Sequence, residues 1–340
     1  RNVTRGRGIP DERLEEVAHH YRHFGGVSPI NDQNRELKAA LEAELARRGV
    51  DLPVYWGNRN WDPYLADALQ AAYDDGHRTL LAIATSAYSS FSSCRQYRED
   101  IAIALDATGL GGEVAVDKVR QYFDHPGFVE PFVEGVVDGV RALLAETGGD
   151  ASAIRLLFAT HSIPTTDAER SGPRDRSFGE GGAYAAQHLA VSEVVATQAA
   201  RELGLERLGW ELVYQSRSGP PSQPWLEPDV NDRIAELPGE GIRGVAVVPV
   251  GFLSDHMEVL WDLDTEAKES AEEAGLAFVR VPTPGSHRRF VEGLVDLVLE
   301  RRDGTPVAER PALTDLGPWF DVCRPGCCEN IRAGFKPAAA

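Results

Sequence analysis

Three carboxylates recur at four-residue intervals in an otherwise apolar part of the chain. The segment 251–267 reads GFLSDHMEVLWDLDTEA and holds Glu258, Asp262 and Glu266, with Asp255 about one turn earlier. Drawn as a helix, it puts these groups on one stripe, because residues four apart stack on the same face. Apolar residues flank the stripe on both sides, which favours a buried helix. The stripe is either a solvated acidic face or a row that lines a cavity and is balanced by cations.

A histidine at the end of an expected strand is the second candidate for chemistry. The apolar run IRLLFAT (154–160) leads directly into His161, and Pro164 prevents a helix from continuing there. Ligands in open α/β sheets bind outside the carboxyl ends of the strands. The run GVAVVPV (244–250) leads in the same way into the acidic helix, with Ser254 as the expected N-cap. A lone histidine after a strand is more often a hydrogen-bonded structural residue. Opposite an uncompensated acidic row, His161 is also a candidate metal ligand or proton acceptor.

The four cysteines form a third group. Cys94 stands alone, whereas Cys323, Cys327 and Cys328 crowd into DVCRPGCCEN around a Pro-Gly turn. We expect no disulfide framework in a cytosolic chain. Three thiols so close together indicate metal ligation, with ordinary buried thiols as the alternative, because CxxxCC is not a strong zinc or ferredoxin pattern.

Apolar runs alternate with stretches of helical periodicity along the chain. The expected strands are 52–57, 79–84, 154–160, 208–214, 244–250 and 277–282. The expected helices are 11–24, 33–48, 62–74, 129–146, 184–203, 255–273 and 287–302. This alternation predicts a doubly wound α/β architecture with parallel sheets covered by helices on both faces. The segment 146–153 is the expected boundary, which gives domains at 1–150 and 151–304 and an extension at 305–340 that carries three cysteines.

Composition excludes several classes of function. The 340 residues carry a formal charge of −18, which argues against a nucleic-acid or anionic-membrane surface. The sequence has no apolar run long enough to span a membrane and no signal peptide, so we expect a cytoplasmic protein without an integral membrane segment. It opens without Met, and we expect it to begin inside a longer protein. The sequence has no P-loop, no GxGxxG after an expected strand and no GxSxG elbow, so we expect no nucleotide.

Four segments together resemble one family, the ferrochelatases, and within it the coproporphyrin ferrochelatases of Gram-positive bacteria. They are FGGVSPI (24–30), LFATHSIP (157–164), YQSRSGPPSQPWLEPDV (214–230) and VVPVGFLSDHMEVLWDLDTEA (247–267). Cys94 and the C-terminal cysteines resemble the actinobacterial branch that carries a 2Fe-2S cluster. A structural Zn²⁺ on the same four thiolates is the second interpretation.

The resemblance implies two Rossmann-like domains of the type II chelatase fold, with a porphyrin cleft between them and a C-terminal extension that returns to the first domain. The first strand of the first domain would precede the given sequence. His161 and Glu258 would be the catalytic and metal-binding pair at the porphyrin centre. Asp262 and Glu266 would extend the metal path outward, on a helix with a π-type irregularity.

The resemblance also implies the reaction and its substrates. Fe²⁺ would enter coproporphyrin III to give coproheme in haem synthesis, with Arg5, Tyr21 and Ser28 at the propionates. We expect a monomer that passes its product to a later haem-synthesis enzyme. Three alternatives stay open: a protoporphyrin IX ferrochelatase, a chelatase for another tetrapyrrole, and a two-lobed tetrapyrrole or iron carrier that catalyses nothing.

Overall fold

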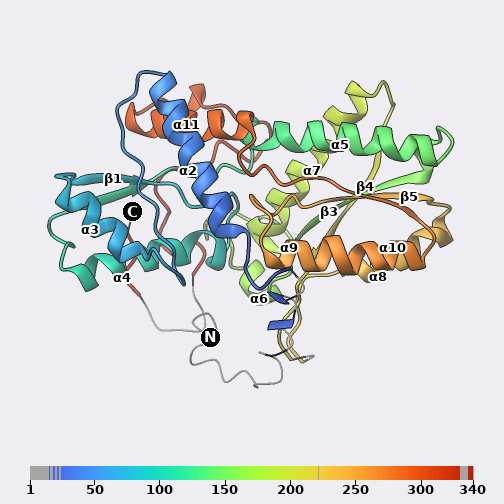
Figure 1. Cartoon of the computed structure of the whole chain (residues 1–340), viewed down its shortest axis with the longest axis horizontal. Helices are drawn as coiled ribbons and strands as arrows, with labels where there is room; N and C mark the ends of the chain where they lie inside the picture. Colours follow the sequence, from blue (N-terminus) through green and yellow to red (C-terminus); the bar gives the residue numbers. More distant parts are fainter. Residues whose placement is uncertain are drawn as a thin grey trace.

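Two parallel sheets form the framework of the protein. The computed structural model describes residues 15, 18, 19, 21, 22, 24–220, 222–329 and 336–339. In the described part, β1 (Thr79–Ala82) pairs with β2 (Ala115–Lys118) in one sheet. The second sheet has the order β4-β3-β5-β6, formed by Gly209–Gln215, Ile154–His161, Gly244–Val248 and Ala277–Arg280 (Figure 1).

The central strands of the larger sheet are apolar along their whole length because helices cover both of its faces. Leu156 and Phe158 of β3 share one cluster with α5 (Pro126–Glu146) and α7 (Gly182–Glu202). Leu157, one position along, belongs to the cluster on the opposite face. Successive side chains of a strand point to opposite faces, so a continuous apolar run contributes residues to the cores on both faces of the sheet.

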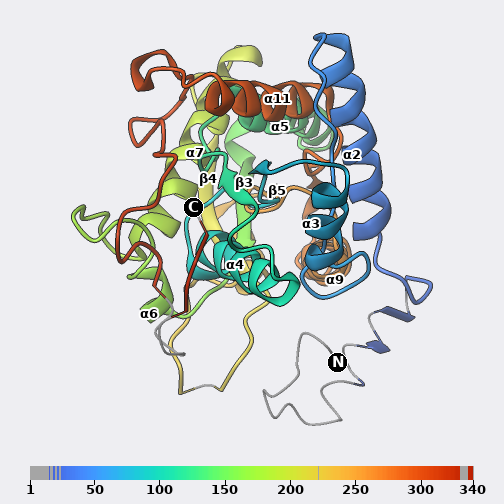
Figure 2. The same ribbon diagram turned by 90° about the vertical axis from the view of Figure 1, so that its left-hand side faces the viewer.

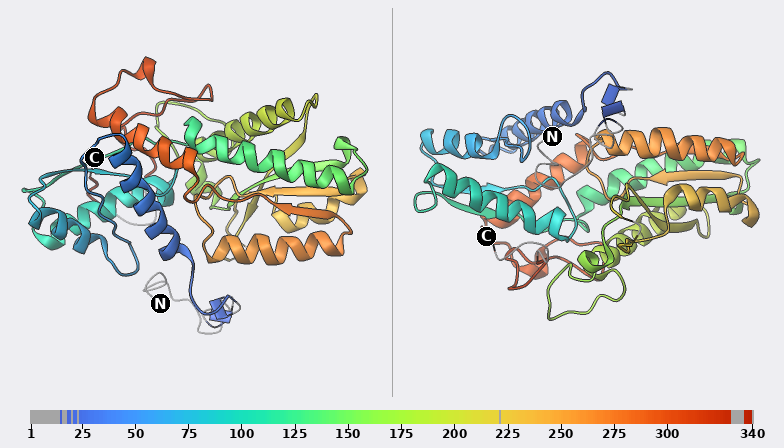
Figure 3. Two further views of the ribbon diagram at one scale, coloured as in Figure 1. Left: turned by 45° about the horizontal axis from the view of Figure 1, so that its top comes forward. Right: turned by 90° about the horizontal axis from the view of Figure 1, so that it is seen from below.

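The opposite face of the larger sheet is covered by one long helical run and a shorter helix. The run consists of α9 (Met257–Trp261), the π-helical η4 (Asp262–Glu266) and α10 (Ala267–Glu273), and the shorter helix is α8 (Val230–Glu236). Figures 1 and 3 show α5 on one side of the strands and α9 with α10 on the other. The acidic stretch therefore lies on a helix that packs on the sheet.

The smaller sheet lies among helices from both ends of the chain. They are α2 (Ile30–Arg47), α3 (Leu65–Asp74), α4 (Gln96–Thr108) and α11 (Arg288–Arg302). Figure 2 shows α11 lying across α5, with α2 along one side. The α5–α11 contact depends on glycine, since a Cβ on Gly127 would lie 2.7 Å from the Cα of Gly293. The C-terminal tail returns to α4, where Arg98 Nε donates to the carbonyl of Ala339 at 2.7 Å.

Short elements complete the described chain. They are the π-helical η1 (Phe91–Arg95), the 3₁₀ turns η2 (Ala151–Ala153), η3 (Leu237–Glu240) and η5 (Val307–Glu309), and α6 (Thr165–Ala168). None of the helices described here is both long and apolar enough to cross a bilayer.

The expected α/β class with helix-covered parallel sheets is confirmed, and five of the six expected strands are present. The expected strand 52–57 is wrong, because the segment forms no ladder with a described strand and Pro53 has no N–H to donate. The strand β2 and the helices α4 and α8 were not expected. The domain limits stay a prediction: α5 lies before residue 150 and packs on β5 and β6 of the second sheet.

Candidate active site

The strand order places the carboxyl ends of β3 and β5, which carry the candidate groups, next to each other. From β3 the chain crosses to β4 on one side and then returns to β5 on the other, so β3 and β5 flank a switch point in the sheet. Ligand sites of open α/β sheets form in the crevice at such a point. His161 is the last residue of β3, and Glu258 lies on α9, the first helix after β5. Topology alone therefore places both residues at one edge.

His161 and Glu258 face each other at that edge. The Nε2 atom of His161 lies 3.8 Å from Oε2 of Glu258, and the side chains are 34% and 59% exposed. The Nδ1 atom of His161 hydrogen-bonds to the carbonyl of Ser162, which can only accept. Nδ1 therefore carries the proton of the neutral ring, and Nε2 presents a lone pair to the carboxylate. Two facing acceptors of this kind are suited to take up a proton or a cation between them.

A π-turn shapes the acidic row that continues from Glu258. The helix begins at Met257, with His256 rather than Ser254 at the N-cap position, so the expected cap is wrong. The expected π-type irregularity is present over Asp262–Glu266, directly after α9. A π-turn adds a residue to the turn and so rotates the side chains that follow it. Glu266 is held at the far end by a 2.8 Å hydrogen bond from the indole Nε1 of Trp261.

Asp262, in the middle of the row, is held by the end of β4. Ser216 Oγ and Gln215 Nε2 both donate to its Oδ2 atom, the latter at 3.1 Å. Burial raises the pKa of Asp262 to about 6, and the neighbouring carboxylates of Glu258 and Glu266 add to this rise. A carboxyl group with such a pKa can both take up and release a proton near neutral pH.

Asp255 does not belong to the row, contrary to the expectation from its spacing. Arg280 of β6 donates to Asp255 at 2.9 Å and to Asp264 at 2.7 Å, so one guanidinium neutralises two carboxylates. Within the described ranges, no Lys or Arg forms an ion pair with Glu258, Asp262 or Glu266. Among the described residues the row therefore has no Lys or Arg partner, and carboxylates without such partners attract cations.

One histidine of the site was missed at the level of the sequence. His256 lies directly before α9, and its ring centroid is 5.1 Å from that of Phe252. Burial lowers its pKa, with opposing effects of Glu258, which raises it, and of His161, which lowers it. Its position two residues before Glu258 in the acidic stretch was the available signal. His256 is a third basic group close to the pair.

The structure describes two of the three residues expected at the substrate propionates. Arg5 lies outside the described residues. Burial raises the pKa of Tyr21, and Glu258 raises it further, so Tyr21 lies near the acidic row. Ser28 Oγ accepts a 3.4 Å hydrogen bond from the amide of Ile30 at the start of α2. Their role as propionate ligands stays a prediction.

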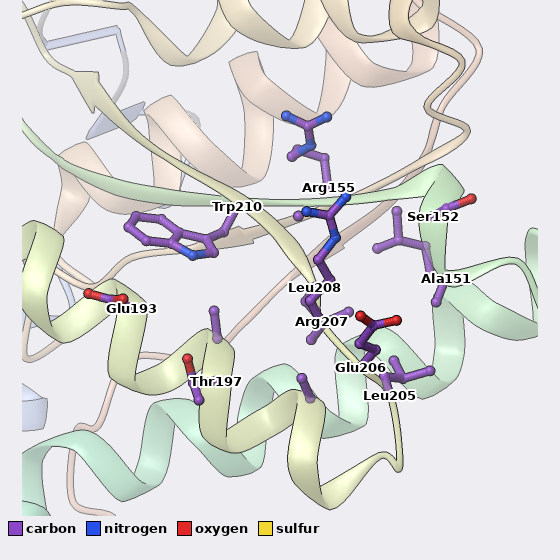
Figure 4. A pocket seen from close by; sticks show the side chains of 14 residues that line it. Ala151, Ser152, Arg155, Glu193, Thr197, Leu205, Glu206, Arg207, Leu208 and Trp210 are labelled. Carbon is purple, nitrogen blue, oxygen red and sulfur yellow. The ribbon is translucent and has the colours of Figure 1, made fainter.

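A large described cavity lies away from this edge. It measures about 780 Å³ and lies at the amino ends of β3 and β4, where Arg155, Arg207 and Trp210 are among the residues that line it (Figure 4). A second cavity, of about 460 Å³, lies between α2, α5 and the loop before α11. Neither of these two cavities is lined by His161 or Glu258, so the convergence of side chains, rather than cavity size, identifies the site.

The four cysteines are free thiols that gather between α4 and the C-terminal extension. The Sγ atoms of Cys94 and Cys323 are 4.0 Å apart, and those of Cys327 and Cys328 are 3.8 Å apart. Hydrogen bonds with Cys327 and Cys94 hold the pKa of the Cys323 thiol below its ordinary range. Among the residues that the structure describes, no three or more His, Cys, Asp or Glu side chains form an arrangement that could hold a metal ion.

Comparison with known proteins identifies close relatives. The chain is 70% identical to the coproporphyrin III ferrochelatase of Leifsonia xyli subsp. xyli, over 100% of this chain and 88% of that protein. It is 57% identical to the coproporphyrin III ferrochelatase of Tropheryma whipplei strain Twist, over 99% and 85%. A ferrochelatase of Rhodopirellula baltica is 45% identical, over 96% and 87%.

A solved structure and a family model complete the comparison. The sirohydrochlorin chelatase SirB from Bacillus subtilis subspecies spizizenii, solved with cobalt, covers 83% of this chain at a TM-score of 0.50 and 12% identity, with 93% of that structure matched. This likeness confirms the expected fold and shows nothing more. The sequence model of the ferrochelatase family matches residues 3–302. The chain therefore belongs to the ferrochelatase family.

Proposed function

We propose that the chain inserts Fe²⁺ into coproporphyrin III, releases two protons and gives coproheme. The observation that carries this proposal is the pair formed by His161 Nε2 and Glu258 Oε2, 3.8 Å apart and followed by an acidic row that no Lys or Arg of the described residues pairs with. The names of the relatives at 70% and 57% identity support the choice of substrate.

The reaction needs a base near the centre of the macrocycle and oxygen ligands that lead to it. Two pyrrole N–H bonds must break while the ion forms bonds to four nitrogens, and charge balances because Fe²⁺ replaces two protons. The lone pair on His161 Nε2 accepts a proton, and Glu258 takes part as its partner or as an iron ligand. Carboxylates are hard oxygen ligands that can replace the water of Fe²⁺ one molecule at a time.

Asp262 and Glu266 extend this chemistry toward solvent. A pKa of about 6 lets Asp262 receive a proton from the centre and release it at neutral pH. The same carboxylates attract incoming cations when they are ionised. We assign to the row the transfer of hydrated Fe²⁺ inward or of protons outward.

The substrate itself imposes a charge problem on an acidic protein. Coproporphyrin III carries four propionates, which need local donors in a chain whose formal charge is −18. We propose Arg5, Tyr21 and Ser28 for this role. The cleft that receives the macrocycle would lie between domain 1–150 and domain 151–304, with the extension 305–340 closing back on the first.

The cysteines are proposed as ligands of a 2Fe-2S cluster, with a structural Zn²⁺ as the second candidate. Two thiolates that are each about 2.3 Å from one tetrahedral metal ion lie about 3.8 Å apart. The Sγ pairs at 4.0 and 3.8 Å fit this spacing, as two pairs on two iron atoms would. When bound, such a cluster supplies one-electron redox chemistry, which metal insertion does not need. Here the four residues would join the extension to the start of α4.

The setting of the reaction is part of the same proposal. Four free thiols favour a reducing compartment, in agreement with a cytoplasmic enzyme. We propose a monomer that binds no nucleotide and passes coproheme to a later haem-synthesis enzyme.

An anaerobic absorption experiment tests the reaction and the substrate together. Fe²⁺ is mixed with the protein and either coproporphyrin III or protoporphyrin IX, and the spectrum is followed with time. Faster conversion of coproporphyrin III to its iron form supports the proposal. Faster conversion of protoporphyrin IX would point to the other ferrochelatase reaction. Binding of both porphyrins without metallation would make the chain a carrier.

A further inference from the structure

A buried chain of four polar contacts lies behind His161. The hydroxyl of Tyr184 is 2.8 Å from the carbonyl oxygen of His161 and 2.9 Å from Oγ1 of Thr160. Oγ1 of Thr160 is 3.0 Å from Nε2 of His188, whose Nδ1 is 2.7 Å from the carbonyl of Tyr184. Thr160, Tyr184 and His188 are all buried. Nothing in the proposed reaction uses these three side chains.

The hydroxyl protons of Thr160 and Tyr184 each have one defined acceptor. Burial lowers the pKa of His188 to about 3, so its ring is neutral and carries one proton. That proton lies on Nδ1, because the carbonyl it faces only accepts, and Nε2 is then an acceptor for Thr160. The carbonyl of His161 also only accepts, and Tyr184 is its donor. The three available protons, on the two hydroxyls and on Nδ1 of His188, are used in three of the four contacts. The contact between Thr160 and Tyr184 is then left without a donated proton.

The contact with Tyr184 fixes the peptide on which the imidazole of His161 depends. The amide of Ser162 donates to the carbonyl of Gln215 at 2.8 Å, while Tyr184 donates to the other side of the same peptide group. The carbonyl of Ser162 in turn accepts a hydrogen bond from Nδ1 of His161. Rotation of the His161–Ser162 peptide would therefore turn the ring away from Glu258.

Tyr184 is itself held from several directions. Its amide donates to Ser171 Oγ at 2.7 Å in the first turn of α7. The ring of His188 stacks on Tyr88 at 3.6 Å between centroids, and the Tyr88 hydroxyl donates to the carbonyl of Val250. The hydrogen bond to His161 therefore comes from a fixed point rather than from a mobile side chain.

We propose that Tyr184 is a positioning residue for His161, which acts by holding the carbonyl of His161 and thereby the direction of its Nε2 lone pair. The inference rests on the proposed function of His161 as proton acceptor. Tyr184 acts through the backbone and touches neither substrate. Its loss should therefore slow the chemical step and leave the binding of porphyrin and iron unchanged.

The variant Tyr184→Phe isolates this bond. The variant keeps the aromatic ring. Two hydrogen bonds remain, from Thr160 to His188 and from His188 to the backbone, and the protons for both are supplied by Thr160 and His188 themselves. Tyr122→Phe is the matched control, because Tyr122 is also buried and donates to a backbone carbonyl, that of Ala84, at 2.7 Å. Both variants lose one hydrogen bond of the same kind, at different distances from His161.

Iron insertion into coproporphyrin III is measured for the wild type and both variants, per mole of protein that binds porphyrin, well below the lowest melting temperature. We expect kcat to fall about tenfold in Tyr184→Phe only, with KM for both substrates within about twofold of wild type. Equal kcat values in the two variants, or a rise in KM without loss of kcat, would overturn the inference. A wild-type protein that binds porphyrin but inserts no iron would instead refute the proposed function.

Discussion

His161 and Gln215 are direct neighbours across the β3–β4 ladder. The backbone carbonyl of Gln215 accepts a hydrogen bond from the amide of Ser162, and the side-chain amide of Gln215 donates a hydrogen bond to Asp262 in the acidic row. One residue at the end of one strand therefore supports both the histidine and the row. This is why the base and the carboxylates are placed in relation to each other rather than independently on two loops.

The first prediction concerns the central pair. Glu258→Gln and His161→Ala should each lower kcat for iron insertion at least about a hundredfold, because each removes a group that we propose accepts a proton or binds iron. Porphyrin binding, followed by quenching of porphyrin fluorescence, should persist. Glu272→Gln is the control, since Glu272 lies on α10 of the same helical run and pairs only loosely with Lys268, at 3.9 Å. Full activity in either site variant would contradict the assignment.

A second prediction follows from the pKa of Asp262. Because the folded protein holds this pKa at about 6, above the ordinary value of 3.8, the folded state binds the proton more tightly than the unfolded state. The stabilisation from this group is complete below about pH 4 and is lost as the pH rises through 6. Across that window Asp262→Asn should therefore gain stability relative to wild type, by up to about 3 kcal/mol.

Urea unfolding of both proteins at pH 4, 5, 6 and 7 measures this difference directly. Asp124 is also buried with a pKa of about 6 and titrates in both proteins, so its contribution cancels in the comparison. A difference between the two proteins that stays constant from pH 4 to pH 7 would show that Asp262 does not titrate in this range.

Sequence was a good guide to the elements that carry long apolar runs and a poor one to the rest. The strand β2 reads AVDK, which is too short and too polar to show a period. The helix α4 buries Arg98 and Glu99 on its inner face, so its pattern does not resemble an amphipathic helix. Apolar periodicity reports burial of apolar groups only, and these two elements bury charged residues as well, Lys118 in β2 and Arg98 with Glu99 in α4.

The candidate site shows the same division. The spacing of Glu258, Asp262 and Glu266 was visible, and so was His161 at the end of a strand. The pairing of Asp255 with Arg280 was not, because 25 residues separate them and only the β5–β6 ladder brings them together. The π-turn was expected from the family resemblance alone, since no local residue pattern predicts one.

The third prediction tests the cysteines as metal ligands. Protein purified without oxygen should contain two iron atoms and two sulfides per chain and show the visible absorption of a cluster. Cys94→Ser and Cys327→Ser should each remove that absorption and lower the melting temperature, because the extension loses its attachment near α4. One zinc per chain with no visible absorption would favour the structural metal. No metal at all in the wild type would contradict both interpretations.

The fourth prediction concerns the close approach of β3 and the chain after β5. The amide of Gly251 donates to the carbonyl of Ala159, and a Cβ at Gly251 would lie 2.6 Å from Cβ of Thr160. Gly251→Ala must therefore displace Thr160, the residue before His161. We expect a loss of about 1–3 kcal/mol in the free energy of unfolding and a lower kcat at unchanged porphyrin affinity.

Gly239→Ala is the matched control, because a Cβ there would meet no atom within 4 Å. It should change neither stability by more than about 0.5 kcal/mol nor activity. Urea unfolding and the anaerobic insertion assay on both variants give the two quantities. If Gly251→Ala loses stability and keeps full kcat, the end of β3 can shift without moving His161. The tight packing behind the histidine would then serve folding alone, and the rigid placement of the base would have to come from the front of the site.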